Sequence, residues 1–130
     1  MARVLGSPYM RGNSDVITNY QVGGTVAAPG QVVGLDTNGK VVPASASIVA
    51  KGIAGLNELG YQSVVETGKM VYCKTADVAN PTIGAQVYFN PTTALVTATA
   101  GTPLNAVFVS GIETAFGGGN CVAIDFVGGM

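Results

Sequence analysis

The side chains that could do chemistry in this chain are few, and their types argue against the common catalytic designs. The 130 residues include no histidine, the commonest general acid or base and the base of most serine and cysteine nucleophiles. The seven carboxylates are dispersed, without the spacing of a calcium loop or another metal site. They are Asp15, Asp36, Glu58, Glu66, Asp77, Glu113 and Asp125. We therefore expect no catalytic residues, no bound metal and no enzymatic activity.

Other stretches that resemble binding motifs have simpler explanations. Gly117-Gly118-Gly119 is the segment most like a phosphate-binding loop, but it lacks the Lys-Ser or Lys-Thr pair and precedes an expected strand. Lys40 follows a turn without the flanking methionine that is typical of biotinyl and lipoyl domains. Cys73 and Cys121 lack the CxxC spacing of a zinc site, and in a reducing compartment we expect two buried thiols. No cofactor is expected.

The composition predicts an assembly partner other than nucleic acid or a membrane. Charged residues make up 10% of the chain, against about 25% in an average soluble domain. Such a surface is easier to reconcile with solubility if partners cover part of it. The net charge of −1 offers no basic footprint for a phosphate backbone. No window reaches the roughly 18 uncharged apolar residues that span a bilayer, and the first residues lack the apolar core of a signal peptide.

The residue pattern predicts an all-β fold. From Tyr20 onward, short runs rich in Val, Ile, Thr, Tyr and Phe alternate with Gly, Pro and Asn. No segment has the length and 3.6-residue period of a helix. We expect about eight short strands in a small closed β-barrel or compact β-sandwich, which would bury the apolar faces and limit free edges. Residues 20–130 should form a single domain.

The clearest hairpin is expected to turn at Asn38-Gly39. These residues readily adopt the positive φ angles of a two-residue type I′ turn, which would place Leu35 opposite Val42. A related hairpin is expected near residues 91–94. The predicted core residues of the two hairpins are Val33, Leu35, Val42, Val87, Phe89 and Val96.

The two hairpins and their flanks are similar enough to predict an internal duplication. Segment 84–90 aligns without gaps on 30–36, and the segments before and after them match in the same order. The matched pairs are 25–29 with 77–81, 30–36 with 84–90, 41–44 with 95–98 and 51–54 with 110–113.

The order of these motifs, over about residues 20–127, resembles the small capsid cement or decoration proteins of tailed bacteriophages. That resemblance implies a structural protein on the outer surface of the phage head, made in the host cytoplasm. It implies that the protein binds junctions between major capsid proteins and stabilises the capsid against internal DNA pressure. It also implies a homo-oligomer, a trimer in preference to a dimer. Residues 1–19 and the Gly117–Gly119 insertion depart from the family pattern.

Residues 1–19 lack strand periodicity and predict an extended N-terminal arm, with a disordered terminus as the alternative. We expect the arm to lie across a sister copy or the major capsid protein, and not against its own barrel. The candidate capsid or subunit contacts are Arg3, Tyr9, Arg11 and Tyr20. The arginines could pair with capsid carboxylates.

An alternative function is a carbohydrate-binding or adhesin-like β module of a phage or bacterial surface. A cluster of exposed aromatic side chains on one face would favour it, although Trp, common in sugar platforms, is absent.

Overall fold

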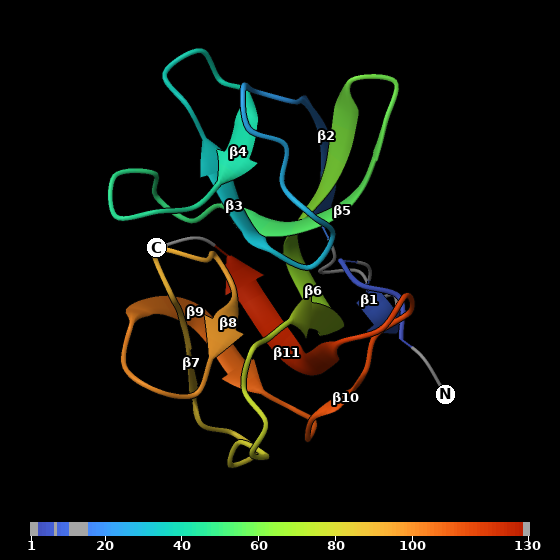
Figure 1. Cartoon of the computed structure of the whole chain (residues 1–130), viewed down its shortest axis with the longest axis vertical. Helices are drawn as coiled ribbons and strands as arrows, with labels where there is room; N and C mark the ends of the chain where they lie inside the picture. Colours follow the sequence, from blue (N-terminus) through green and yellow to red (C-terminus); the bar gives the residue numbers. More distant parts are fainter. Residues whose placement is uncertain (1–2, 7, 11–15, 129–130) are drawn as a thin grey trace.

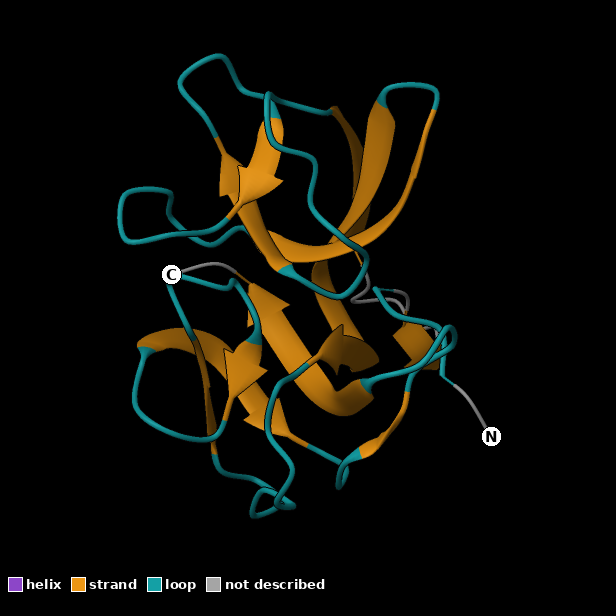
Figure 2. Ribbon diagram, in the orientation of Figure 1, coloured by secondary structure: helices purple, strands orange, loops and turns teal. Residues whose placement is uncertain are grey.

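The computed structural model describes residues 3–6, 8–10 and 16–128, and this part of the chain is all-β, as expected. Eleven strands form an antiparallel sheet that curls into a half-barrel (Figures 1 and 2). The strands are β1 (Pro8–Met10), β2 (Val16–Gln21), β3 (Val32–Leu35), β4 (Val41–Pro43), β5 (Gly52–Glu58), β6 (Tyr61–Lys74), β7 (Gln86–Phe89), β8 (Val96–Thr97), β9 (Thr102–Phe108), β10 (Glu113–Thr114) and β11 (Asn120–Gly128). No helix that could cross a membrane occurs in the described ranges.

The sheet consists of two units that share the long strand β6. The N-terminal part of β6 pairs with β5 and β2, and its C-terminal part pairs with β11 and β1. The first unit has the order β4-β3-β5-β6-β2, and the second has the order β8-β7-β9-β11-β6. Figure 1 shows them as an upper and a lower lobe. Single parallel bridges, Val22 with Val41 and Thr75 with Val96, join the two ends of each unit.

Backbone hydrogen bonds repeat between the units. The N–H of Gly30 donates to the carbonyl of Ala54 at 2.7 Å, and the N–H of Gly84 donates to Phe108 at 2.8 Å. The return bonds, from the N–H groups of Ala54 and Phe108 to the residues after these glycines, measure 2.9 and 3.1 Å. Segments 30–36 and 84–90 therefore occupy the same place in their units, as the alignment predicted.

Two parts of the predicted alignment are wrong. Leu35 pairs with Val41 and Phe89 pairs with Val96, so Val41 corresponds to Val96 and the match of 41–44 with 95–98 is off by one residue. Gly52 and Ile53 belong to β5, which pairs with β3, and the strand in that position of the second unit is β9. Gly111 and Ile112 instead lie between β9 and β10. The dipeptide match was therefore coincidental, because two residues carry too little pattern to fix a register.

The β3–β4 hairpin differs from the predicted register by one residue. Leu35 pairs with Val41, so Val41 is buried and Val42 is half-buried. Leu35 is half-buried too, whereas four predicted core residues are buried, which confirms that part of the prediction. These four are Val33, Val87, Phe89 and Val96. A one-residue slip moves a side chain to the other face because side chains alternate along a strand.

The Asp36 carboxylate explains the shift. Its Oδ1 accepts the N–H of Asn38 at 2.9 Å and that of Lys40 at 3.0 Å. The N–H of Asp36 donates to the carbonyl of Lys40 at 2.9 Å, so the turn holds residues 37–39, with Gly39 at a φ of 76°. This is a three-residue hairpin loop with glycine in the left-handed position, not the expected two-residue turn.

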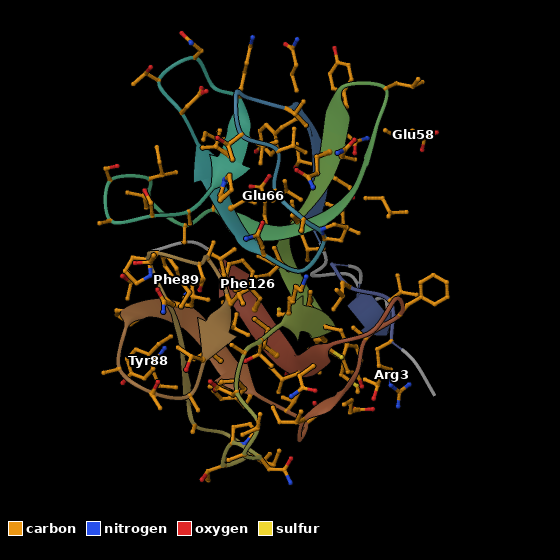
Figure 3. The ribbon with its side chains drawn as sticks, in the orientation of Figure 1. Arg3, Glu58, Glu66, Tyr88, Phe89 and Phe126 are labelled. Atoms are coloured by element: carbon orange, nitrogen blue, oxygen red, sulfur yellow. The ribbon has the colours of Figure 1, made fainter. Side chains whose placement is uncertain are left out.

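Two clusters of buried side chains make up most of the apolar interior. The first is small and includes Val33, Val41, Ala54 and Val64. The second is larger and spans both units, because it joins Val32, Ile53 and Val65 of the first unit to the buried aromatic rings of the second, among them Phe89 and Phe126 in Figure 3. Both cysteines are buried and free, as expected, and burial raises the pKa of each thiol.

The N-terminal segment packs on its own sheet. β1 pairs with β6 through Pro8 opposite Val71, and β2 continues along the same strand to Tyr61. The N–H of Gly6 donates to the carbonyl of Tyr72 at 2.9 Å. The expectation that residues 1–19 lie away from their own barrel is therefore wrong for the described part. β6 extends through both units, and β1 and β2 supply its backbone partners.

Candidate docking surface

Arg3, a predicted partner contact, is held within the chain. Its Nε donates to Oε1 of Glu113 at 2.8 Å, and its guanidinium lies 5.2 Å from the centre of the Tyr72 ring. The Tyr72 hydroxyl donates to the other oxygen of Glu113 at 2.8 Å. Burial raises the pKa of Glu113, but the hydrogen bonds from Arg3 and Tyr72 outweigh it and hold that pKa below its ordinary value. Arg3 therefore fastens the N-terminal segment to β10 (Figure 3).

Tyr20 also has partners within the chain. Its hydroxyl donates to Oε2 of Glu66 at 2.7 Å, while Nζ of Lys51 lies 3.3 Å from Oε1 of the same carboxylate. Burial raises the pKa of Glu66, but the hydrogen bonds that it accepts, first from Tyr20, hold the pKa below its ordinary value. Tyr20 is half-buried against the core of the first unit. A role for Arg3 or Tyr20 in partner contact stays a prediction.

The other two predicted contacts have no described side chain. Tyr9 lies in β1, whose backbone is described, and Arg11 lies outside the described residues. Of the two candidates whose side chains are described, Arg3 binds Glu113 and Tyr20 binds Glu66, so the structure does not bring these two together.

The described carboxylates do not gather into a metal site. No group of three or more His, Cys, Asp or Glu side chains in the described ranges could hold a metal ion. A groove of about 550 Å³ beside β6, β9 and β11 includes Lys69 and Asp125. Oδ1 of Asp125 accepts the N–H of Met70 at 3.0 Å, so this carboxylate binds the backbone of β6 at Met70, whose φ is 51°.

An exposed apolar surface begins at the β5–β6 hairpin. Glu58 pairs with Tyr61, so Leu59 and Gly60 form a two-residue turn, and both have positive φ angles of 54° and 81°. Leu59 is 92% exposed, and Leu56 and Tyr61 are 69% and 54% exposed. A leucine held in the left-handed region is strained, and such strain is often found at functional positions. Figure 3 shows Glu58 at this outer end of the molecule.

The surface continues towards the second unit through a groove of about 240 Å³. Leu56 lines this groove together with Val4, Phe116 and the side chain of Lys74. Phe116 is 76% exposed, and its backbone N–H donates to the carbonyl of Arg3 at 2.7 Å. We call the five exposed side chains the apolar strip: Val4, Leu56, Leu59, Tyr61 and Phe116.

The residue pattern places the aromatic residues mostly within strands, where either core packing or subunit contact explains them, so it did not separate exposed rings from buried ones. Tyr72, Phe89, Phe108 and Phe126 are indeed buried, whereas Tyr61 and Phe116 are exposed. The available signal was Phe116 next to three glycines, a large ring beside a turn. For the described residues, the two exposed rings sit on different elements among aliphatic side chains, and this arrangement does not favour a sugar-stacking platform.

The described residues define an all-β protein with an exposed apolar strip that spans two related units, and this strip is a candidate docking surface. No family model, curated protein or solved structure matches the chain.

Proposed function

We propose that this protein is a structural, non-enzymatic component of a tailed-phage virion. It binds the outer surface of the head and cements junctions between major capsid proteins, as the residue pattern of the decoration-protein family implies. The observation that carries the proposal is the apolar strip. Its members come from the N-terminal segment, the β5–β6 hairpin and the β10–β11 turn, so a partner that covers it contacts both units.

The physical argument is the free energy of burying the strip. Covering apolar surface contributes about 25 cal/mol per Å², and three strip side chains are more than two thirds exposed. These three are Leu56, Leu59 and Phe116. Exposed side chains of this size on one surface are typical of protein interaction sites. Avidity then adds to the strength of attachment, because an oligomer detaches only when several such contacts are lost together.

The experiment is binding to heads that lack the protein. Wild type, Leu56→Asp and Phe116→Asp are mixed with undecorated heads, and the bound fraction is measured by co-sedimentation. Val78→Asp is the matched control, because Val78 is 84% exposed and lines neither groove beside the strip. Each strip variant should raise the apparent Kd about tenfold or more, since a charge must be desolvated in the contact, while the control binds as wild type. Absence of wild-type binding, or equal loss in all three variants, would contradict the proposal.

A further inference from the structure

β2 is an edge strand whose outer side has no described partner at its centre. Its inner side pairs regularly with β6 from Ile17 to Gln21. No described strand pairs with the opposite side between Ile17 and Asn19. Ile17, Asn19 and Gln21 are all exposed. An edge of this kind presents backbone N–H and C=O groups that can accept another strand.

The hydrogen bonds at the end of β2 show which groups face outward. The N–H of Val22 donates to Gly60 in the β5–β6 turn, on the inner side, at 2.9 Å. The next N–H, that of Gly23, donates to Val41 on the other side, also at 2.9 Å. Because backbone groups alternate sides along a strand, Ile17 and Asn19 direct their N–H and C=O groups outward, on the side of Gly23.

In the second unit, the edge that corresponds to β2 is already paired with a strand. There the C-terminal part of β6 takes the place of β2, and β1 pairs with its outer side, with Pro8 opposite Val71. Val22 and Thr75 hold equivalent positions, because each forms the parallel bridge of its unit. Thr18 and Val71 each lie four residues before these positions, so they are equivalent as well. A strand added at Thr18 would therefore take the position that β1 has in the second unit.

β2 also lacks the devices that protect the other edges. β1 begins with Pro8, β4 contains Pro43 and follows Lys40, and β8 has only two residues. Proline, lysine and short length are the usual means by which proteins block pairing between edges. β2 has six residues, VITNYQ, without a charge or a proline.

We propose that β2 pairs antiparallel with β2 of a second copy of this chain, around a twofold axis at Thr18. Each Ile17 then lies opposite the other copy's Asn19, and each such pair exchanges two backbone hydrogen bonds. A second copy suits this edge because a twofold interface uses one patch twice, and an uncharged strand meets no like charge there. The inference goes beyond the proposed function and does not depend on it, and it gives a dimer where the resemblance implies a trimer in preference.

Sedimentation of the full chain at micromolar concentrations tests the pairing. Wild type should sediment as a dimer. Asn19→Pro removes an outward N–H and leaves the bonds to β6, and Ile17→Lys places two like charges near the axis, so each should raise the dimer Kd about tenfold or more. Val78→Lys is the control, because it adds the same charge at an exposed residue that lies outside β2 and outside the groove beside Asn19, and it should leave the dimer intact.

Thermal melts of the same samples show whether each variant is folded, and Ile17→Lys serves if Asn19→Pro fails to fold. A monomeric wild type would overturn the inference. So would a wild-type oligomer that both folded edge variants retain, or one that only Val78→Lys dissociates. Head binding is measured separately, so a monomeric variant that still binds heads would support the pairing and leave the proposed function in place.

Discussion

Tyr72 on β6 donates its hydroxyl to Glu113 on β10 at 2.8 Å, beneath the guanidinium of Arg3. This bond joins the strand shared by both units to the element that holds the N-terminal segment. Burial, followed by the hydrogen bond to Glu113, raises the pKa of Tyr72 to about 12. The arrangement therefore stabilises the fold only while the phenol keeps its proton.

Stability should depend on this bond in the alkaline range. The folded pKa of Tyr72 lies above the ordinary value of 10.0, so the contribution of this bond to stability is complete below pH 10 and is lost as the pH rises towards 12. Tyr72→Phe should lower the free energy of unfolding by about 1 to 2 kcal/mol at pH 8. The difference from wild type should shrink between pH 10 and 12, as measured by denaturant unfolding. Tyr61→Phe, at an exposed ring, is the control, and wild-type and Tyr72→Phe curves that stay parallel would contradict the assignment.

The stability that Glu113 contributes changes with pH in the opposite direction to that of Tyr72. The pKa of Glu113 is held below its ordinary value, so its contribution is present above the unfolded pKa and is lost as the pH falls through the folded one. Glu113→Gln should therefore be less stable than wild type near neutral pH. The difference between their free energies of unfolding should narrow as Glu113 of the wild type becomes protonated. Denaturant unfolding from pH 7 to acid measures both curves, and a gap that widens on acidification would refute this linkage.

Packing of the N-terminal segment on β5 can be tested at Gly6. A Cβ at Gly6 would lie 1.8 Å from the carbonyl oxygen of Ala54, and the φ of Gly6 is 69°. Gly60 has a similar φ of 81° but open space around it. Both alanine variants lose about 1 to 2 kcal/mol from the left-handed backbone, and Gly6→Ala should lose a further 1 to 3 kcal/mol, roughly, from the clash. Equal losses in denaturant unfolding would mean that residues 3–6 do not pack as described.

The strand content could be predicted from the sequence, but registers could not. The alternation of β-branched residues located both hairpins, and the match of 30–36 with 84–90 located the repeat. The Asn38-Gly39 signal failed because the side chain of Asp36, one residue outside the assumed turn, binds two backbone N–H groups. Competition of this kind between a side chain and the expected turn depends on local geometry that residue types do not specify.

The apolar strip was harder to predict because the exposure of a side chain depends on where its strand leaves the sheet. β5 is buried from Gly52 to Gly55 and exposed from Leu56 to Glu58, since its second half extends beyond the barrel. An apolar residue in a strand gives the same sequence signal whether it lies in the buried half or in the exposed half. The N-terminal segment was assigned to a partner because its strands are short and irregular, whereas pairing with the long β6 places them on the same chain.

Relieving the backbone strain at Leu59 should preserve or raise stability but weaken head binding. Asparagine tolerates the left-handed backbone better than leucine, so Leu59→Asn should keep or raise the free energy of unfolding, by up to about 1 kcal/mol. The same change removes the most exposed apolar side chain of the strip and should weaken head binding. Val78→Asn is the control for an exposed apolar residue outside the strip. A Leu59→Asn variant that binds heads as tightly as wild type would remove the turn from the docking surface.

The most direct test of the proposed function is electron cryo-microscopy of undecorated heads after incubation with the full chain. We predict density for the β-fold at junctions between major capsid proteins, with Leu59 and Phe116 of the apolar strip facing the capsid. Heads that stay bare at saturating protein, or bound copies whose apolar strip faces the solvent, would contradict the account.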